Sequence, residues 1–156
     1  MTHNISYSGP KIALYQPDIP QNTAAIVRTC SCLGVQLEII EPCGFFLSDP
    51  RFKRVVMDYM DISSIKFYKS YKEFVETKKS ERIILATTKA KDIYTNFNFK
   101  KYDTLLFGRD SSGVPKSLHN SIKYKIKIPM VKNKRSLNLA TSVAIIISEG
   151  LRQTFY

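Results

Sequence analysis

Short apolar runs alternate with stretches of helical periodicity along this chain, and this alternation constrains the fold more than any other feature. The apolar runs lie at 12–15, 35–40, 65–68, 82–86, 104–107 and 124–128. Helix-like stretches lie near 21–33, 50–58, 70–78, 115–120 and 138–153. Strands that alternate with helices in this way form a mostly parallel sheet. We therefore predict an α/β fold with a mostly parallel sheet and helices on both faces.

The length and the cysteines bear on the domain organisation. With 156 residues, one core can bury about two thirds of the surface that the unfolded chain exposes. We expect a short polar tail at residues 1–10 and a single domain at residues 11–156. Cys30, Cys32 and Cys43 have small or apolar neighbours, which predicts reduced, partly buried thiols in a reducing compartment. Their spacing is not that of a metal site, so we predict no metal.

The remaining bulk properties bear on location and partners. No apolar run approaches the length of about 20 residues that spans a bilayer, and the N-terminal residues lack the regions of a signal peptide. We therefore predict a cytoplasmic protein that does not enter a membrane. The formal net charge of +11 favours a polyanionic partner, of which nucleic acid is the obvious candidate. A Lys-rich composition can also reflect coding bias, so charge alone leaves the partner open.

Three junctions between an apolar run and a helix-like stretch are rich in Asn, Ser, Gly and Arg. They lie at 20–28, 106–115 and 128–143. Ligands of open parallel sheets bind outside the carboxyl ends of the strands, which is where such junctions meet. The dinucleotide-binding and phosphate-loop glycine motifs are absent, and this argues against an ordinary Rossmann dehydrogenase or a P-loop enzyme. The junctions predict a ligand site of another kind.

Several candidate residues also have a purely structural interpretation. Gly108 and Gly113 either let the backbone approach a flat ligand closely or simply form a turn. Arg28 has apolar neighbours, so we expect it to be half-buried and to need an anion. That anion is either a phosphate or the carboxylate of Asp18 or Asp110.

The third junction leaves similar alternatives. Ser136 or Asn138 can cap the helix that follows, although two such side chains are more than one cap requires. The basic residues Lys132, Lys134 and Arg135 form either a solvated loop face or a contact to an RNA backbone. Residues alone do not decide between these interpretations.

Taken together, the three junctions resemble the motifs of the SPOUT superfamily of RNA methyltransferases, specifically its TrmH-type ribose 2′-O-methyltransferases. Asn22 followed six residues later by Arg28 resembles the first motif. Phe107-Gly-Arg-Asp-Ser-Ser-Gly-Val-Pro115 resembles the second, and Ile128-Pro-Met130 followed by Ser136-Leu-Asn-Leu139 resembles the third. The resemblance extends over nearly the whole chain.

Within that superfamily, other segments look like the TrmL (YibK) subgroup, which methylates the wobble ribose of certain leucine tRNAs. They are Leu14 to Asn22, Ile40-Glu-Pro42, Gly44-Phe45, Asp58-Tyr59 and Glu149 to Gln153. The resemblance implies a C-terminal trefoil knot, S-adenosylmethionine as cofactor, and a homodimer whose active sites combine both subunits. It also implies that the substrate is the anticodon loop of a tRNA, for which leucine tRNA is our expectation.

The same resemblance assigns residues to roles. It implies Arg28, Asn22, Ser136 and Asn138 as catalytic residues. It implies that the cofactor is bound by Ala86, Thr87, Thr88, Gly108, Asp110, Gly113, Ile128, Met130, Ser136 and Leu137. The alternatives are a ribose 2′-O-methyltransferase for ribosomal RNA or for another tRNA position, and a noncatalytic RNA-binding module with the same fold.

Overall fold

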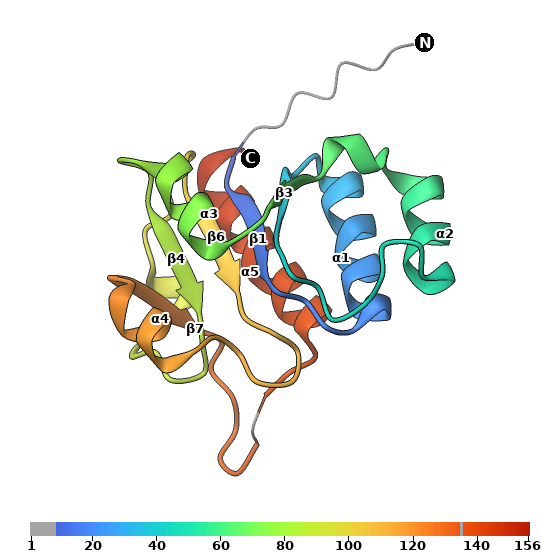
Figure 1. The fold of residues 1–156 in the computed structure, drawn as a ribbon. Coiled ribbons are helices and arrows are strands. Elements are labelled where there is room, and N and C mark those ends of the chain that lie inside the picture. Colours follow the sequence, from blue (N-terminus) through green and yellow to red (C-terminus); the bar gives the residue numbers. More distant parts are fainter. Residues whose placement is uncertain (1–8, 135) are drawn as a thin grey trace.

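Seven parallel strands form one sheet in the computed structural model, which describes residues 9–134 and 136–156 (Figure 1). Their order in the sheet is β3-β2-β1-β6-β4-β7-β5. The strands are β1 (Lys11–Tyr15), β2 (Leu37–Ile40), β3 (Lys66–Tyr68), β4 (Ile83–Ala86), β5 (Asp92–Ile93), β6 (Thr104–Phe107) and β7 (Tyr124–Lys127). Because all of them run the same way, the carboxyl ends of β1, β4, β6 and β7 meet at one edge of the sheet.

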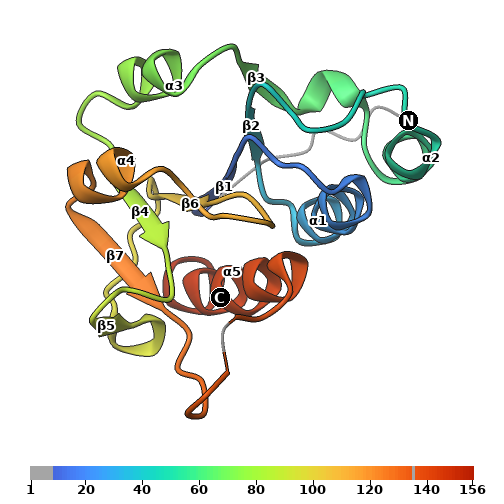
Figure 2. The same cartoon turned by 60° about the horizontal axis from the view of Figure 1, so that its bottom comes forward.

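Helices cover both faces of this sheet, as predicted (Figure 2). The helices α1 (Pro20–Leu33), α2 (Pro50–Tyr59) and α5 (Leu139–Thr154) contribute to the core on one face. The helices α3 (Tyr71–Lys78) and α4 (Lys116–Ser121) contribute to the core on the other face. Two short 3₁₀ helices, η1 (Ile62–Ser64) and η2 (Tyr94–Asn96), complete the elements.

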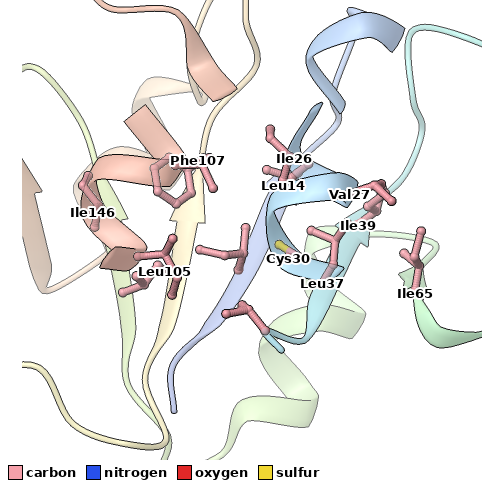
Figure 3. Packing of buried hydrophobic residues seen from close by; sticks show 14 of the residues in the cluster. Leu14, Ile26, Val27, Cys30, Leu37, Ile39, Ile65, Leu105, Phe107 and Ile146 are labelled. Atoms are coloured by element: carbon pink, nitrogen blue, oxygen red, sulfur yellow. The ribbon is translucent and has the colours of Figure 1, made fainter. Parts of the chain in front are cut away.

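The larger core lies between the strands and the helices α1, α2 and α5. Leu14 and Leu105 come from adjacent central strands, Ile26 from α1 and Ile146 from α5, and all four are at most 1% exposed (Figure 3). Burying a side chain of this size stabilises the fold by about 1.5–3 kcal/mol. The apolar runs of the sequence are thus the sheet, and the apolar stripes of the helices cover it.

The predicted elements agree with the structure within a few residues. All six predicted strands and all five predicted helices are present. The sequence interpretation missed β5, because its two residues are too few to give an apolar run. It also began the second strand at Val35, two residues before Leu37.

Other predictions on the organisation of the chain have no structural outcome. Of the predicted tail at 1–10, residues 1–8 lie outside the described part, and the assignment of 11–156 to a single domain stays a prediction. The C-terminal knot stays a prediction as well.

None of the helices in the described part of the chain is both long and apolar enough to cross a membrane. All three cysteines are free, with Cys30 buried, Cys43 half-buried and Cys32 exposed, so the prediction of partial burial is wrong for Cys32.

Candidate active site

A cavity of about 310 Å³ lies at the carboxyl ends of β4, β6 and β7. Three segments line it, and each follows one of these strands: residues 87–89 follow β4, residues 108–114 follow β6, and Ile128, Met130, Ser136 and Leu137 follow β7. Apolar side chains, including those of Leu85, Phe107 and Ile146, form another part of its wall. The cavity therefore combines an apolar surface with polar loops, as small-molecule sites commonly do.

The structure brings all ten predicted cofactor residues to this one cavity. Its lining includes Ala86, Thr87, Thr88, Gly108, Asp110, Gly113, Ile128, Met130, Ser136 and Leu137. Sequence reasoning missed other lining residues, among them Lys89, Arg109 and His119. His119 belongs to the short helix α4, and its Nε2 lies 3.3 Å from Oγ1 of Thr87. No motif of the sequence marks His119, because only the fold of α4 over β4 places it here.

The two glycines of the second junction are required by the loop itself. The backbones of Arg109 and Gly113 exchange two hydrogen bonds, of 2.9 and 3.0 Å, which close the loop into a tight turn. A Cβ atom on Gly108 would lie 2.5 Å from the carbonyl carbon of Gly113, which is closer than any normal contact. Gly113 has a φ of +67°, a conformation that side chains other than glycine rarely adopt. Both glycines thus shape the cavity wall.

Hydrogen bonds join the three motif segments next to the cavity, which Asp110 lines but Asn22 and Asn138 do not. Asn22, at the start of α1, donates from Nδ2 to Oδ1 of Asp110 at 2.7 Å. Asn138 donates from Nδ2 to Oδ1 of Asn22 at 3.0 Å. Its own Oδ1 accepts from the backbone N–H of Thr141 at 3.2 Å and so caps α5. Asn138 therefore serves as the helix cap and as a link between motifs, and the interpretation of Ser136 as the cap is wrong.

The carboxyl groups of Asp110 and Asp18 lie close together at this junction and differ in their tendency to ionise. Burial raises the pKa of Asp110, and its contact with Asp18 raises it further, although the hydrogen bond from Asn22 opposes the shift. Burial also acts to raise the pKa of Asp18. Hydrogen bonds from Ser111 and Asp110 and the charge of Arg109 outweigh burial, so the pKa of Asp18 is lowered. Asp18 is therefore the stronger acid of the pair.

Arg28 is not part of the cavity lining. The expectation that it is half-buried is also wrong. It is exposed, and it shares the exposed face of α1 with Gln21, Ala25 and Cys32, which follow one another at helical spacing. Its guanidinium lies 4.8 Å from the ring centroid of Tyr59 on α2. The prediction of burial failed because Ile26 and Val27, its neighbours in sequence, point to another side of the helix.

The alternative of a salt bridge from Arg28 to Asp18 or Asp110 is also wrong. Within the described residues, the nearest cation to Asp18 is Arg109, at 3.7 Å, and Asp110 accepts from Asn22. Lys132 and Lys134 are exposed in the loop before α5, and Arg135 lies outside the described residues.

Comparison with known proteins gives consistent matches over nearly the full length. Residues 10–148 match the SpoU rRNA Methylase family. A tRNA (cytidine(34)-2′-O)-methyltransferase of Beijerinckia indica is 45% identical over 146 residues, which cover 91% of this chain and 90% of that relative. A solved structure that concerns the 2-OH methylation of C/U34 on tRNA has a TM-score of 0.88 and 34% identity, and the match covers 95% of this chain and 97% of that chain.

The fold extends to more distant proteins. An AdoMet-bound rRNA methyltransferase of Sinorhizobium meliloti has a TM-score of 0.83 at 20% identity, and the match covers 94% of this chain and 57% of that one. At this identity the likeness concerns the fold.

Proposed function

Because this chain belongs to the SpoU methylase family, we propose that it transfers the methyl group of S-adenosylmethionine to the ribose 2′-hydroxyl of nucleotide 34 in tRNA. The family is the one that the sequence motifs resemble, and its members are RNA methyltransferases, so the chain is an enzyme. The observation that carries the proposal is that the second and third motif segments line one cavity and that hydrogen bonds through Asn22 join the first segment to both, at Asp110 and Asn138.

The cavity fits S-adenosylmethionine in size and in chemistry. Its volume of about 310 Å³ lies in the range of small-molecule sites. Gly108 and Gly113 let the loop backbone form one wall, and the partly exposed apolar side chains of Ile128 and Leu139 offer a surface for a flat ring. When bound, the cofactor supplies an activated methyl group on a sulfonium. We propose that the ten lining residues predicted from the sequence hold it, and that positioning supplies most of the rate.

We further propose that the polar residues near the cavity orient the ribose and that Arg28 assists at the oxygen. A guanidinium stays protonated at all physiological pH values, so Arg28 is unsuited to act as a general base. It can hold an RNA phosphate and stabilise the alkoxide that develops as the 2′-hydroxyl loses its proton. Asn22 and Asn138 are fixed by their mutual hydrogen bond, and Ser136 lies exposed at the cavity, where its hydroxyl can contact substrate.

The position of Arg28 supports a homodimer. Arg28 is exposed on α1 and is not part of the lining of the cavity in its own chain. A second copy that places its own Arg28 at this cavity would complete the site, as the resemblance to TrmH-type enzymes implies. Leucine tRNA as the substrate, a cytoplasmic location and a knotted C-terminal segment belong to the same proposal. The net charge of +11 supports an RNA partner.

The experiment that tests the proposal is transfer of labelled methyl from S-adenosylmethionine to total tRNA. A 2′-O-methyl group protects the adjoining phosphodiester from alkaline cleavage, so the modified position can be mapped. Protection at nucleotide 34 of leucine tRNA is the expected result. Transfer to another tRNA position, or to ribosomal RNA alone, would contradict the proposed substrate but would leave the reaction type intact. An absence of cofactor binding would contradict the reaction itself.

A further inference from the structure

The side chain of Asp18 contacts three consecutive residues of the loop that forms one wall of the cavity. Its Oδ1 accepts from the backbone N–H of Asp110 at 3.1 Å. Its Oδ2 accepts from the hydroxyl of Ser111 and lies 3.7 Å from Nη2 of Arg109. Asp18 lies between β1 and α1, 92 residues away from Asp110 in the sequence. The carboxylate of Asp18 thus contacts a backbone N–H, a hydroxyl and a guanidinium of a loop that is distant in sequence.

The contact is reciprocal, which makes it more specific than a surface ion pair. The backbone N–H of Asp18 donates to Oδ2 of Asp110 at 3.4 Å, while Asp110 donates its own backbone N–H to Asp18. Asp110 also accepts from Asn22, six residues before Arg28 on α1. The loop and the start of α1 are therefore held in a fixed relation by hydrogen bonds in both directions.

The segment that follows β2 packs against Asp18 on another side. The backbone N–H of Gly44 donates to the carbonyl of Pro17 at 2.8 Å. A Cβ atom on Gly44 would lie 2.7 Å from Cβ of Asp18, so the segment after β2 packs directly against Asp18. The side chain of Asp18 is only 16% exposed. Its position is therefore set by the sheet, whereas Ser111, Ser112 and Gly113 at the tip of the cavity loop are exposed.

Within the loop, the backbone turn between Arg109 and Gly113 fixes the internal shape but not the placement of the tip over the cavity. The Nη2 of Arg109 lies 3.7 Å from Asp18, while its buried Nε has no hydrogen-bond partner among the described residues. Outside the loop, the carboxylate of Asp18 anchors the exposed tip, beside the hydrogen bond from Asn22 to Asp110.

We propose that Asp18 is a positioning residue of the methyl-transfer site, which holds residues 109–111 in the conformation that binds the cofactor. The inference rests on the proposed function, because it takes the cavity to be the S-adenosylmethionine site. It assigns no contact between Asp18 and the reacting atoms. Instead, Asp18 fixes the wall on which Gly108, Asp110 and Gly113 lie.

The test measures binding of S-adenosylhomocysteine by titration calorimetry to the full chain carrying Asp18→Ala. Loss of hydrogen bonds to a charged group should raise Kd by at least about tenfold, because the loop then spends little time in the binding conformation. In methyl-transfer assays, KM for the cofactor should rise in parallel, while kcat at saturating cofactor stays within about threefold of wild type. The matched control is Asp92→Ala, which removes an exposed carboxylate on β5 outside the cavity lining.

Two further variants separate positioning from general stability. Asp18→Asn keeps the shape of the side chain and one of its two acceptor oxygens. It loses the other acceptor oxygen and the negative charge that faces Arg109. It should bind at least about threefold more weakly at an unchanged Tm. Ser111→Ala should weaken binding less, and its effect should shrink in the Asp18→Ala background, because both changes break the same contact.

The outcomes distinguish this inference from the proposed function. Wild-type protein that binds no S-adenosylhomocysteine would overturn the proposed function. Wild-type binding together with equal binding by both Asp18 variants would overturn the inference alone. Weaker binding that follows the fall in Tm in Asp18→Ala, with wild-type binding by Asp18→Asn, would likewise reduce Asp18 to a stability residue and overturn it.

Discussion

Substitution of Gly108 by alanine tests whether the cavity loop must pack against itself to bind the cofactor. The added Cβ would lie 2.5 Å from the carbonyl carbon of Gly113 and 2.9 Å from the backbone N of Val114. These are backbone atoms, so relief requires the loop to move by about 1 Å, since interiors tolerate little overlap. Such a shift disrupts the hydrogen bonds of 2.9 and 3.0 Å between Arg109 and Gly113.

The expected magnitude follows from these contacts. Two lost hydrogen bonds cost about 2 kcal/mol, and the overpacking that remains adds about 1 kcal/mol or more. A penalty of about 3 kcal/mol on the loop conformation that binds the cofactor corresponds to about a 100-fold loss of affinity. This reason differs from the simple expectation that Gly108 makes room for a ligand, because the space is taken by the loop's own backbone.

Gly113→Ala is the matched control in the same loop. A Cβ on Gly113 meets no atom within 4 Å, and only its φ of +67° is unfavourable for alanine. That strain costs about 1 kcal/mol, which corresponds to about a fivefold loss of affinity. Titration calorimetry with S-adenosylhomocysteine measures both variants. Binding by Gly108→Ala within about fivefold of wild type, or a larger loss in Gly113→Ala, would refute the reasoning.

The remaining predictions concern Arg28, the buried ion pair and the thiols. Arg28→Ala should bind S-adenosylhomocysteine within a few-fold of wild type, whereas methyl transfer to tRNA should fall at least about 100-fold, and normal turnover would remove Arg28 from the mechanism. Lys78→Met should lower Tm by about 10 °C, because it removes the cation that pairs with the buried carboxylate of Glu38. As a control, Lys72→Met, at an exposed position, should leave Tm within about 2 °C of wild type. Burial raises the pKa of the Cys30 thiol to about 12, and burial with the charge of Glu41 raises that of Cys43 to about 11, so iodoacetamide at pH 8 should label Cys32 first, as mass spectrometry can show. Since the folded state holds these two thiol protons more tightly than the unfolded state, the free energy of unfolding should also fall as the pH rises from about 9 towards 12, and a flat profile there would contradict the burial of Cys30.

The fold and the location of a ligand site were predictable because both depend on local patterns, whereas the individual lining residues, among them Ala86, Thr87 and Thr88, were implied by the resemblance to a family. Buried parallel strands are short apolar runs, and the carboxyl ends of such strands meet at one edge whatever the loops contain. Gly108 and Ser136 could therefore be assigned to one site from the junctions in which they occur. The two-residue strand β5 and the placement of His119 have no comparable signal, since neither has a periodicity that the sequence displays.

The contact between Asp18 and Asp110 could not have been derived from the sequence for a different reason. The two residues are 92 positions apart, and their pairing depends on β1 lying next to β6 in the sheet. The sequence interpretation assigned both carboxylates to Arg28 as alternative partners, because charge complementarity alone does not fix geometry. In the fold, Arg109 and Asn22 are the neighbours that the topology provides.

Helix geometry determines the directions in which the two residues of the first motif point. Asn22 and Arg28 lie six residues apart on α1, so their side chains point in directions about 120° apart and are separated by about 9 Å along the axis. Asn22 donates to Asp110, which lines the cavity, although Asn22 itself is not part of the lining, while Arg28 is exposed against Tyr59 of α2. The two side chains of the motif therefore lie on different sides of α1. If both residues act on one ribose, as we propose, an Arg28 from a second copy of the chain would meet the Asn22 side of the first, and the spacing within the motif agrees with the proposed dimer.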